Sequence, residues 1–181
     1  FSLHTRHTAY LFRVMETGHL EHLYYGRKIH PAIDGLMEQH AFAPGNTNIY
    51  DSEHLQFSLE DACLEMSSFG KGDIREPFVE LTLSDGSETS DFLFEKFEQG
   101  TGKEEFETLP GSYDESGEVE WLGVTLRDKN SGVILELHYY VYEDCDVITR
   151  SAKLINESGD VVKLNRLMSL QLDLEPSDYV F

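Results

Sequence analysis

The stretch "PFVELTLSDGSETSDFLFEKFEQG", residues Pro77–Gly100, predicts the fold class of this chain. From Phe78 to Leu83 polar and apolar residues alternate, which places them on opposite faces of an extended strand. Asp85-Gly86 follows, a dipeptide that favours the tight turn of a β-hairpin because both residues tolerate positive φ. Ser90 to Phe97 is expected to return as the partner strand. The stretch therefore predicts antiparallel β-structure.

The same alternation extends over both ends of the chain. Residues Phe1–Gly18 show it, and residues Val119–Glu175 repeat it in strands rich in Val, Ile, Leu, Thr and Tyr. Turn signals interrupt the second range at Lys129–Gly132, Glu143-Asp144 and Glu157–Asp160. No helical periodicity of comparable length competes with this pattern. We therefore expect an all-β, antiparallel β-sandwich of two packed sheets, with residues 1–181 in one domain.

The segment Ile29–Phe69 departs from the alternation and contains two prolines and two glycines. Its scattered apolar residues include Ile33, Leu36, Met37 and Phe42. They are too irregular to line a sandwich face and too many to be left in water. We therefore expect the segment to reach outward from the main core and to serve self-association into a dimer or higher oligomer.

The charge of the chain limits its partners. With 34 acidic and 14 basic residues, its formal net charge is −20. Such a surface repels phosphate backbones and anionic lipids, so nucleic acid and membranes are not expected as partners, whereas neutral sugars are not repelled. Two cysteines, Cys63 and Cys145, are too few for a secreted disulfide scaffold. We expect a cytoplasmic protein.

The stretch "GHLEHLYYG", Gly18–Gly26, contains two histidines that suggest a metal site. On a strand, however, His19 and His22 lie three residues apart and point to opposite faces. They cannot converge on one ion, so we expect no metal and no cofactor. The sequence also lacks a nucleophile elbow, a phosphate-binding loop and a reactive cysteine context. We expect no catalytic residue in this chain.

Several stretches in this order resemble the N-terminal domain of family 36 glycoside hydrolases, the microbial α-galactosidases or melibiases. The four main ones are "TGHLEHLYYG" (17–26), "GKGDIREPF" (70–78), "DVITRSAKLIN" (146–156) and "LNRLMSLQLDLEPSDY" (164–179), and "TLPGSYDESGEVEWLGVTLRD" (108–128) also fits. The resemblance covers nearly the whole chain. The chain departs from the family where Glu65 is followed by Met66-Ser67 in place of Tyr-Pro, and where Ile74 replaces a usual Phe.

The resemblance implies a larger enzyme that hydrolyses terminal α-galactosides by a retaining double displacement. Family members carry a β-supersandwich, then a TIM barrel that holds both catalytic aspartates, then a small β domain. This chain would be an incomplete supersandwich without the barrel, and alone it is expected to be inactive. Lys71-Gly72-Asp73 imitates the sequence around the family nucleophile but lies far upstream of it.

The resemblance also implies that subunits form tetramers in which this domain helps to shape the mouth of a neighbour's active site. The candidate substrate-binding residues are Asp34, Asp73 and Arg75, because arginine presents a fixed fork of donors and carboxylates accept from sugar hydroxyls. Arg75 could instead form an ion pair with Asp73, Glu76 or another acid, and Asp34 before Gly35 could be a turn residue.

Trp121, the single tryptophan, raises a further alternative. It could serve as a platform on which a sugar stacks, but its alternation with Val119 and Gly123 favours packing in the core. Two other functions stay open at this stage. One is a stand-alone carbohydrate-binding or interaction module, which needs an exposed aromatic strip. The other is a mutarotase-like sugar epimerase, which needs a histidine and a carboxylate on a concave sheet face.

Overall fold

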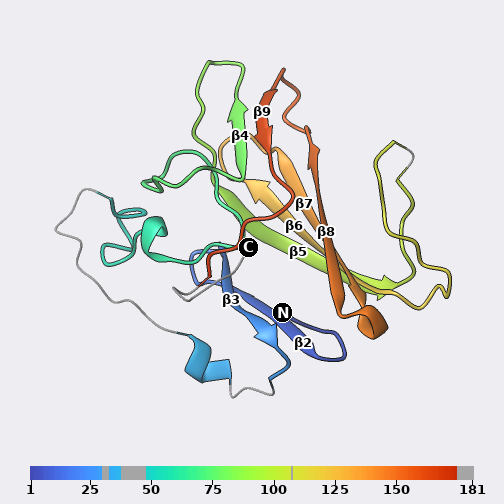
Figure 1. The fold of residues 1–181 in the computed structure, drawn as a ribbon. Helices are drawn as coiled ribbons and strands as arrows, with labels where there is room; N and C mark the ends of the chain where they lie inside the picture. The colour runs from blue at the N-terminus through green and yellow to red at the C-terminus, as the bar shows by residue number, and fades with distance from the viewer. Residues whose placement is uncertain (30–32, 38–47, 107, 175–181) are drawn as a thin grey trace.

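The computed structural model describes residues 1–29, 33–37, 48–106 and 108–174, without the side chains of residues 33 and 34. Within this part the chain forms nine strands and three 3-10 helices (Figure 1). The strands are β1 (Ser2–His4), β2 (Thr8–Val14), β3 (Leu20–Arg27), β4 (Val79–Thr82), β5 (Phe92–Thr101), β6 (Glu120–Asp128), β7 (Ile134–Tyr142), β8 (Val147–Ile155) and β9 (Lys163–Leu167). The 3-10 helices are η1 (Ile33–Leu36), η2 (Leu59–Asp61) and η3 (Glu143–Cys145).

The strands form three antiparallel sheets, which confirms the all-β prediction. One has the order β5-β6-β7-β8, the second β1-β2-β3, and the third is a ribbon of β4 and β9. The four-stranded sheet packs one face against side chains of both smaller sheets. Among the described residues no helix has the length and apolar character to cross a membrane.

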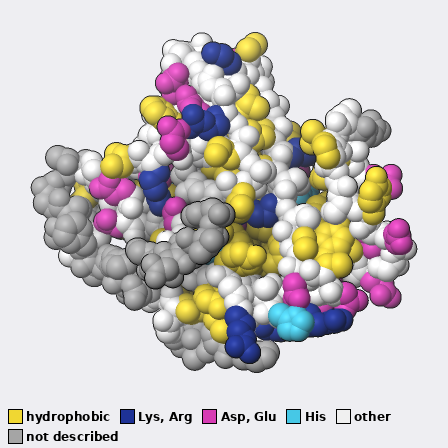
Figure 2. Space-filling model, in the orientation of Figure 1, with side chains coloured by type: hydrophobic (Ala, Val, Ile, Leu, Met, Phe, Trp, Pro, Cys, Tyr) yellow, Lys and Arg dark blue, Asp and Glu magenta, His cyan; other side chains and the backbone are white. Residues whose placement is uncertain are grey.

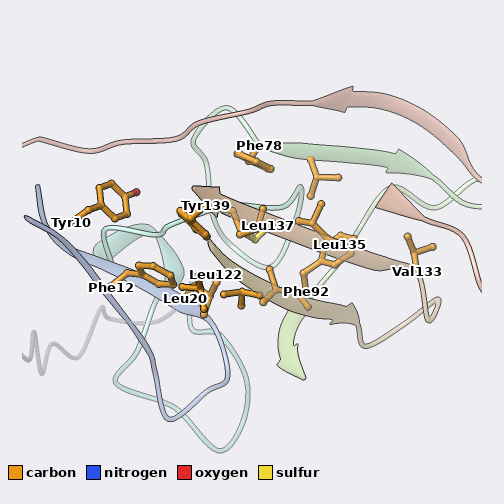
Figure 3. Packing of buried hydrophobic residues seen from close by; sticks show 14 of the residues in the cluster. Tyr10, Phe12, Leu20, Phe78, Phe92, Leu122, Val133, Leu135, Leu137 and Tyr139 are labelled. Atoms are coloured by element: carbon orange, nitrogen blue, oxygen red, sulfur yellow. The ribbon is translucent and has the colours of Figure 1, made fainter. Parts of the chain in front are cut away.

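The main core lies on the inner face of the four-stranded sheet (Figure 3). Leu122, Val124 and Leu126 of β6 alternate into it, while Phe12 stacks on the ring of Tyr139 with centroids 5.1 Å apart. Burying each such side chain stabilises the fold by about 1.5–3 kcal/mol before conformational entropy is subtracted. The alternation read from the sequence thus holds within β6, and packing against the other two sheets determines which of its faces is buried.

The pairing expected for the Pro77–Gly100 stretch is wrong, although its turn is present. The backbone reverses at Asp85-Gly86, where Leu83 N donates to Ser87 O (2.8 Å). However, β4 pairs with β9, and β5 pairs with β6. Before β5 begins, Ser90 N already donates to Phe69 O and Asp91 N to Asp128 Oδ1. These contacts direct the returning arm into another sheet, so the turn determines the reversal but not the partner.

The interpretation of Trp121 as a core residue is also wrong. Leu122 and Val124 occupy the inner face of β6, and Trp121 lies half-buried on the outer face with Gly123. The sequence pattern is misleading because Trp121 is two residues after the buried Val119, which suggests that both point to the same side. The strand begins only at Glu120, however, so Val119 lies before it and does not show which face of the strand Trp121 is on.

The segment Ile29–Phe69 is only partly separate from the main core. Tyr50, Leu59, Ala62 and Leu64 form a second, small cluster with partly buried Met15 and Phe57. Met66, in contrast, belongs to the main core. Leu36 and Met37 are partly buried, whereas Phe42 and the side chain of Ile33 lie outside the described residues. The last part of this segment is therefore a structural element of the sandwich.

Candidate functional site

The loop Gly70–Arg75 contains two of the three predicted site residues, and its backbone is unusual. Gly70, Lys71 and Gly72 all have positive φ, at 95°, 59° and 83°. Glycine is required at the first position because a methyl group there would lie 2.8 Å from Thr89 Cγ2. Lys71 Nζ lies 4.7 Å from the centre of the Tyr50 ring, a cation–π contact that joins the loop to the segment Ile29–Phe69.

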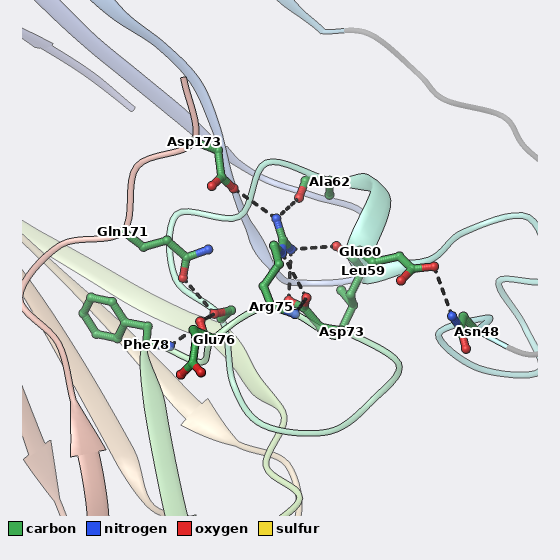
Figure 4. Close-up of polar contacts among 11 residues, drawn as sticks. Asn48, Leu59, Glu60, Ala62, Asp73, Arg75, Glu76, Phe78, Gln171 and Asp173 are labelled. Carbon is green, nitrogen blue, oxygen red and sulfur yellow. Dashed lines mark hydrogen bonds and ion pairs between the residues drawn. The ribbon is translucent and has the colours of Figure 1, made fainter. Parts of the chain in front are cut away.

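Arg75 fixes this loop through all five of its N–H groups (Figure 4). Nε and Nη2 donate to the two oxygens of Asp73, each at 2.9 Å. The remaining N–H groups donate to the carbonyls of Leu59 (2.9 Å) and Ala62 (2.7 Å) and to Asp173 Oδ2 (3.0 Å). Burial lowers the pKa of Arg75, but the adjacent Asp73 and Asp173 more than offset this, so the pKa is raised and the charge is firmly held.

The three predicted site residues are therefore placed differently. Asp73 and Arg75 lie together as a bidentate ion pair, while Glu76 pairs with Arg166 instead. Asp73 has only 2% of its side chain exposed, so both of its oxygens are turned inward. Asp34 lies in η1, and its side chain lies outside the described residues. Between the paired residues, Ile74 is 82% exposed, so the loop presents an apolar tip to solvent.

A buried polar cluster at Glu65 was missed from the sequence. Glu65 is 0% exposed and accepts hydrogen bonds from the hydroxyls of Tyr10 and Tyr139, both at 2.7 Å. Arg150 Nη1 lies 3.0 Å from Glu65 Oε1, and His22 Nδ1 lies 3.3 Å from Oε2. Burial first, and then the Glu65 carboxylate, raise the pKa of both tyrosines, so the phenols stay protonated and donate. The cluster connects β2, β3, β7 and β8.

One sequence signal could have indicated this cluster. Arg150 shares the parity of Ile148, Ala152 and Leu154 on β8, which places an arginine on a core face. A buried arginine requires a buried carboxylate. Glu65 supplies it because residues 63–65 run beside β3, with Glu65 N donating to Leu20 O.

His19 belongs to a second buried network. Its Nε2 lies 3.0 Å from Asp91 Oδ1 and its Nδ1 lies 2.9 Å from Thr17 Oγ1. Tyr50 donates to the other oxygen of Asp91 (2.9 Å). Burial raises the pKa of Asp91, but the hydrogen bonds from His19 and Tyr50 outweigh it and lower the pKa overall. His19 and His22 thus bind different carboxylates, as their opposite parity suggests.

Neither network has the arrangement of an open reactive centre. The carboxylates of Glu65, Asp73 and Asp91 are all enclosed and hydrogen-bonded to neighbouring side chains. Among the residues that the structure describes, no three His, Cys, Asp or Glu side chains are grouped so that they could hold a metal ion. The chemistry available at the Gly70–Arg75 loop is binding and packing.

Comparison with known proteins shows the family of the chain. Residues 18–181 match the family model for the glycosyl hydrolase family 36 N-terminal domain. The chain is 31% identical to the bifunctional alpha-galactosidase/sucrose kinase AgaSK of Mediterraneibacter gnavus, over 99% of this chain and 19% of that protein. It is 30% identical to alpha-galactosidase AgaA of Geobacillus stearothermophilus, over 99% of this chain and 25% of that protein.

Solved structures show the same fold. The alpha-galactosidase of Lactobacillus brevis superposes with a TM-score of 0.86 at 34% identity, over 96% of this chain and 24% of that one. A variant of Geobacillus stearothermophilus AgaA in complex with raffinose superposes with a TM-score of 0.89 at 29% identity, over 99% of this chain and 25% of that one. The chain therefore spans about a quarter or less of the relatives it matches, and it belongs to the N-terminal domain family of glycoside hydrolase family 36.

Proposed function

We propose that residues 1–181 serve as the non-catalytic N-terminal β-sandwich domain of a larger, cytoplasmic α-galactosidase that hydrolyses terminal α-galactosides. The observation that carries this proposal is the likeness to AgaA over 99% of the chain. AgaA variants have been solved with raffinose and with stachyose, both of which are neutral oligosaccharides. A formal charge of −20 does not oppose such substrates.

The state of the carboxylates supports a non-catalytic role. Glycoside hydrolysis needs two carboxyl groups that face the scissile bond from opposite sides. Asp73 is locked in a fork by Arg75, and Glu65 and Asp91 are enclosed in the interior. The barrel that the family resemblance implies would supply the nucleophile and the acid/base.

We further propose that the Gly70–Arg75 loop and η1 contribute to the rim of a neighbouring subunit's active site. The polar residues of this rim are Asp73 and Arg75 in the loop and Asp34 in η1. Because Arg75 has no N–H group left for a sugar, it and Asp73 act by positioning the loop. The exposed Ile74 at the tip of the loop then makes the contact across subunits. Burial of this side chain in an oligomer interface would remove its apolar surface from water, which is favourable.

An activity assay tests the main proposal. The chain alone is expected to release no product from p-nitrophenyl α-galactoside, whereas the full-length protein that carries it is expected to hydrolyse both this substrate and raffinose. Turnover by the chain alone that survives re-purification and disappears in a point variant of this chain would contradict a non-catalytic role. A full-length protein without α-galactosidase activity would contradict the proposed parent reaction.

Light scattering and kinetics of the full-length protein test the rim. We expect an oligomer, and we expect Ile74→Asp and Asp34→Ala to raise KM for raffinose without lowering the melting temperature. Ile74 is suited to this test because its exposed side chain makes no contribution to the loop's hydrogen bonds. A monomer with unchanged kinetics in both variants would remove the loop from the site.

A further inference from the structure

The outer face of the four-stranded sheet carries a small aromatic pocket. It is lined by Thr101 at the end of β5, by Gly102–Glu104 of the loop that follows, and by Trp121, His138 and Tyr140 of β6 and β7. The loop extends beyond the sheet at the right of Figure 1, where it joins β5 to β6. The pocket volume is about 350 Å³, at the lower end of the roughly 300–1,000 Å³ typical of small-molecule sites. We call it the Trp121 pocket.

The Trp121 ring packs closely against two glycines. Gly100 lies opposite Trp121 on β5, and a methyl group there would lie 3.0 Å from the indole Nε1. A methyl group at Gly123 would lie 3.4 Å from Cζ3 of the same ring. The indole therefore lies along the sheet across both glycines, where any larger residue would lift it. Because the glycines lie against one side of the ring, its other side is left to line the pocket.

Polar groups converge beside this ring. His138 pairs with Gly123 across the sheet, and its Nε2 lies 3.4 Å from Glu136 Oε2. Tyr140 pairs with Trp121 and is only 3% exposed because the loop covers it. Lys103 Nζ lies 5.2 Å from the centre of the Tyr140 ring and donates to the backbone oxygen of Glu104. The pocket thus combines a flat apolar floor with donors and acceptors at its side.

Charge narrows the choice of ligand. Glu104 and Glu136 lie beside Lys103 and His138, so the pocket has no excess positive charge to hold an anion. The whole chain, at −20, also repels anions. A neutral ligand with an apolar face and a hydroxyl rim fits both the floor and the side of the pocket. A pyranose ring has these properties, because its C–H groups stack on aromatic faces while its hydroxyls bind polar side chains.

We propose that the Trp121 pocket binds one neutral hexose unit of an oligosaccharide. The choice of a terminal α-galactose as that unit rests on the proposed function, whereas the stacking itself does not. The site would hold the enzyme on a larger carbohydrate. It also gives the lone tryptophan a role that core packing does not explain.

The chain reports on this site directly, because Trp121 is its single tryptophan. Fluorescence excited at the indole band is expected to change saturably as raffinose or stachyose is added to the 181-residue chain, with Kd on the order of 1 mM as expected for a small contact area. His138→Ala and Lys103→Ala keep the reporter and are expected to weaken binding by roughly 3–10-fold each. Arg127→Ala, on the same outer face near the other end of β6, is the matched control and should leave Kd unchanged.

Trp121→Phe and Trp121→Ala, followed by calorimetry, complete the test without the reporter. Phe is expected to keep part of the affinity and Ala to abolish it, with circular dichroism confirming that both remain folded. No saturable change with any of the sugars, or equal affinity in Trp121→Ala, would overturn the proposal. Equal binding of maltose and raffinose would overturn only the choice of galactose. Since the chain is assayed without turnover, failure of the parent reaction would not affect either result.

Discussion

Two arginines, Arg75 and Arg150, each bind a carboxylate that is enclosed by the protein, yet the two clusters have different roles. Arg75 places all five N–H groups on acceptors contributed by loops and by η2. Arg150, with 7% of its side chain exposed, leaves Nη2 without a partner among the described residues and lies over the ring of Tyr139 at 4.9 Å. Two of its partners, Tyr10 of β2 and Tyr139 of β7, belong to strands of different sheets.

The difference shows what each cluster determines. The Glu65–Arg150 cluster lies within the sandwich core, so it controls how the three-stranded and four-stranded sheets pack together. The Asp73–Arg75 cluster lies outside the main core and joins one loop to η2 and to the segment after β9, as the contacts in Figure 4 illustrate. On the face of the molecule drawn in Figure 2, hydrophobic, acidic and basic side chains are interspersed. Breaking the first should affect global stability, and breaking the second should affect mainly the loop.

The largest expected effect comes from Glu65→Gln. The substitution keeps the shape of the side chain but leaves the Arg150 charge buried without a counter-charge, which typically destabilises a protein by about 3–5 kcal/mol. Urea denaturation measures this loss. The double variant Glu65→Leu/Arg150→Met is expected to recover only part of it, because it removes the unpaired charge but leaves the buried hydroxyls of Tyr10 and Tyr139 without their acceptor. A loss below about 1 kcal/mol in the single variant would show that the cluster does not join the sheets.

Arg75→Lys should cost less, about 2 kcal/mol, because lysine cannot form the fork to Asp73 and leaves the carbonyls of Leu59 and Ala62 without donors. The matched control is Arg127→Lys, whose bidentate pair with Glu95 is well exposed, and we expect a change within about 1 kcal/mol there. If the two substitutions lowered the free energy of unfolding equally in urea denaturation, the burial of Asp73 would add no stability to its ion pair with Arg75. The Arg75 cluster could then not be compared with the buried Arg150 cluster.

Gly70→Ala examines the same loop through its backbone. Gly70 and Gly86 have similar φ values, 95° and 85°, but only Gly70 faces another atom, Thr89 Cγ2, at 2.8 Å from the position of a Cβ. Positive φ alone costs about 1 kcal/mol for alanine. Gly70→Ala is therefore expected to destabilise the protein by roughly 1 kcal/mol more than Gly86→Ala in thermal melting. Matching losses would show that the loop moves freely away from Thr89.

The sequence predicts the sheets better than it predicts the contacts between them. Alternation identifies which residues share a strand face, because side chains in a strand follow a period of two. It does not decide which face is buried, since Leu122 and Val124 lie inside, on the face opposite Trp121. It cannot choose which strand pairs with which, since the partner of β4 is β9, more than 80 positions away in the chain. The Asp85-Gly86 signal is local and carries no information about that choice.

The candidate sites were predictable to different degrees. Asp73 and Arg75 lie two residues apart, so their ion pair follows from a short loop. Glu65 and Arg150 meet only after residues 63–65 align beside β3, which no local pattern reveals. Trp121 was assigned to the wrong face because one flanking valine lies outside the strand. Residues two positions apart share a face only where both belong to the same strand, so the rule fails when one of them lies beyond the end of the strand.

The smallest expected effect extends the comparison to a partly exposed carboxylate, Asp146, at the end of η3. Its oxygens accept from Thr5 Oγ1 (2.8 Å) and His7 N (2.6 Å) and lie 2.6 Å from His7 Nδ1. These contacts, with the His7 side chain first, lower the pKa of Asp146 to about 2.

The folded-state pKa of Asp146 is thus below the unfolded value of about 3.9. The contribution of its charge to the stability of the fold is therefore complete above about pH 4 and is lost as the pH falls toward 2. Asp146→Asn keeps the left-handed conformation, which asparagine tolerates, and removes the charge. We expect the variant to melt slightly below the parent chain at pH 6 by circular dichroism, and we expect the gap to close between pH 4 and pH 2. A gap that stays constant over that range would mean that the charge of Asp146 contributes nothing, and that among these carboxylates only the enclosed ones, Asp73 and Glu65, stabilise the fold.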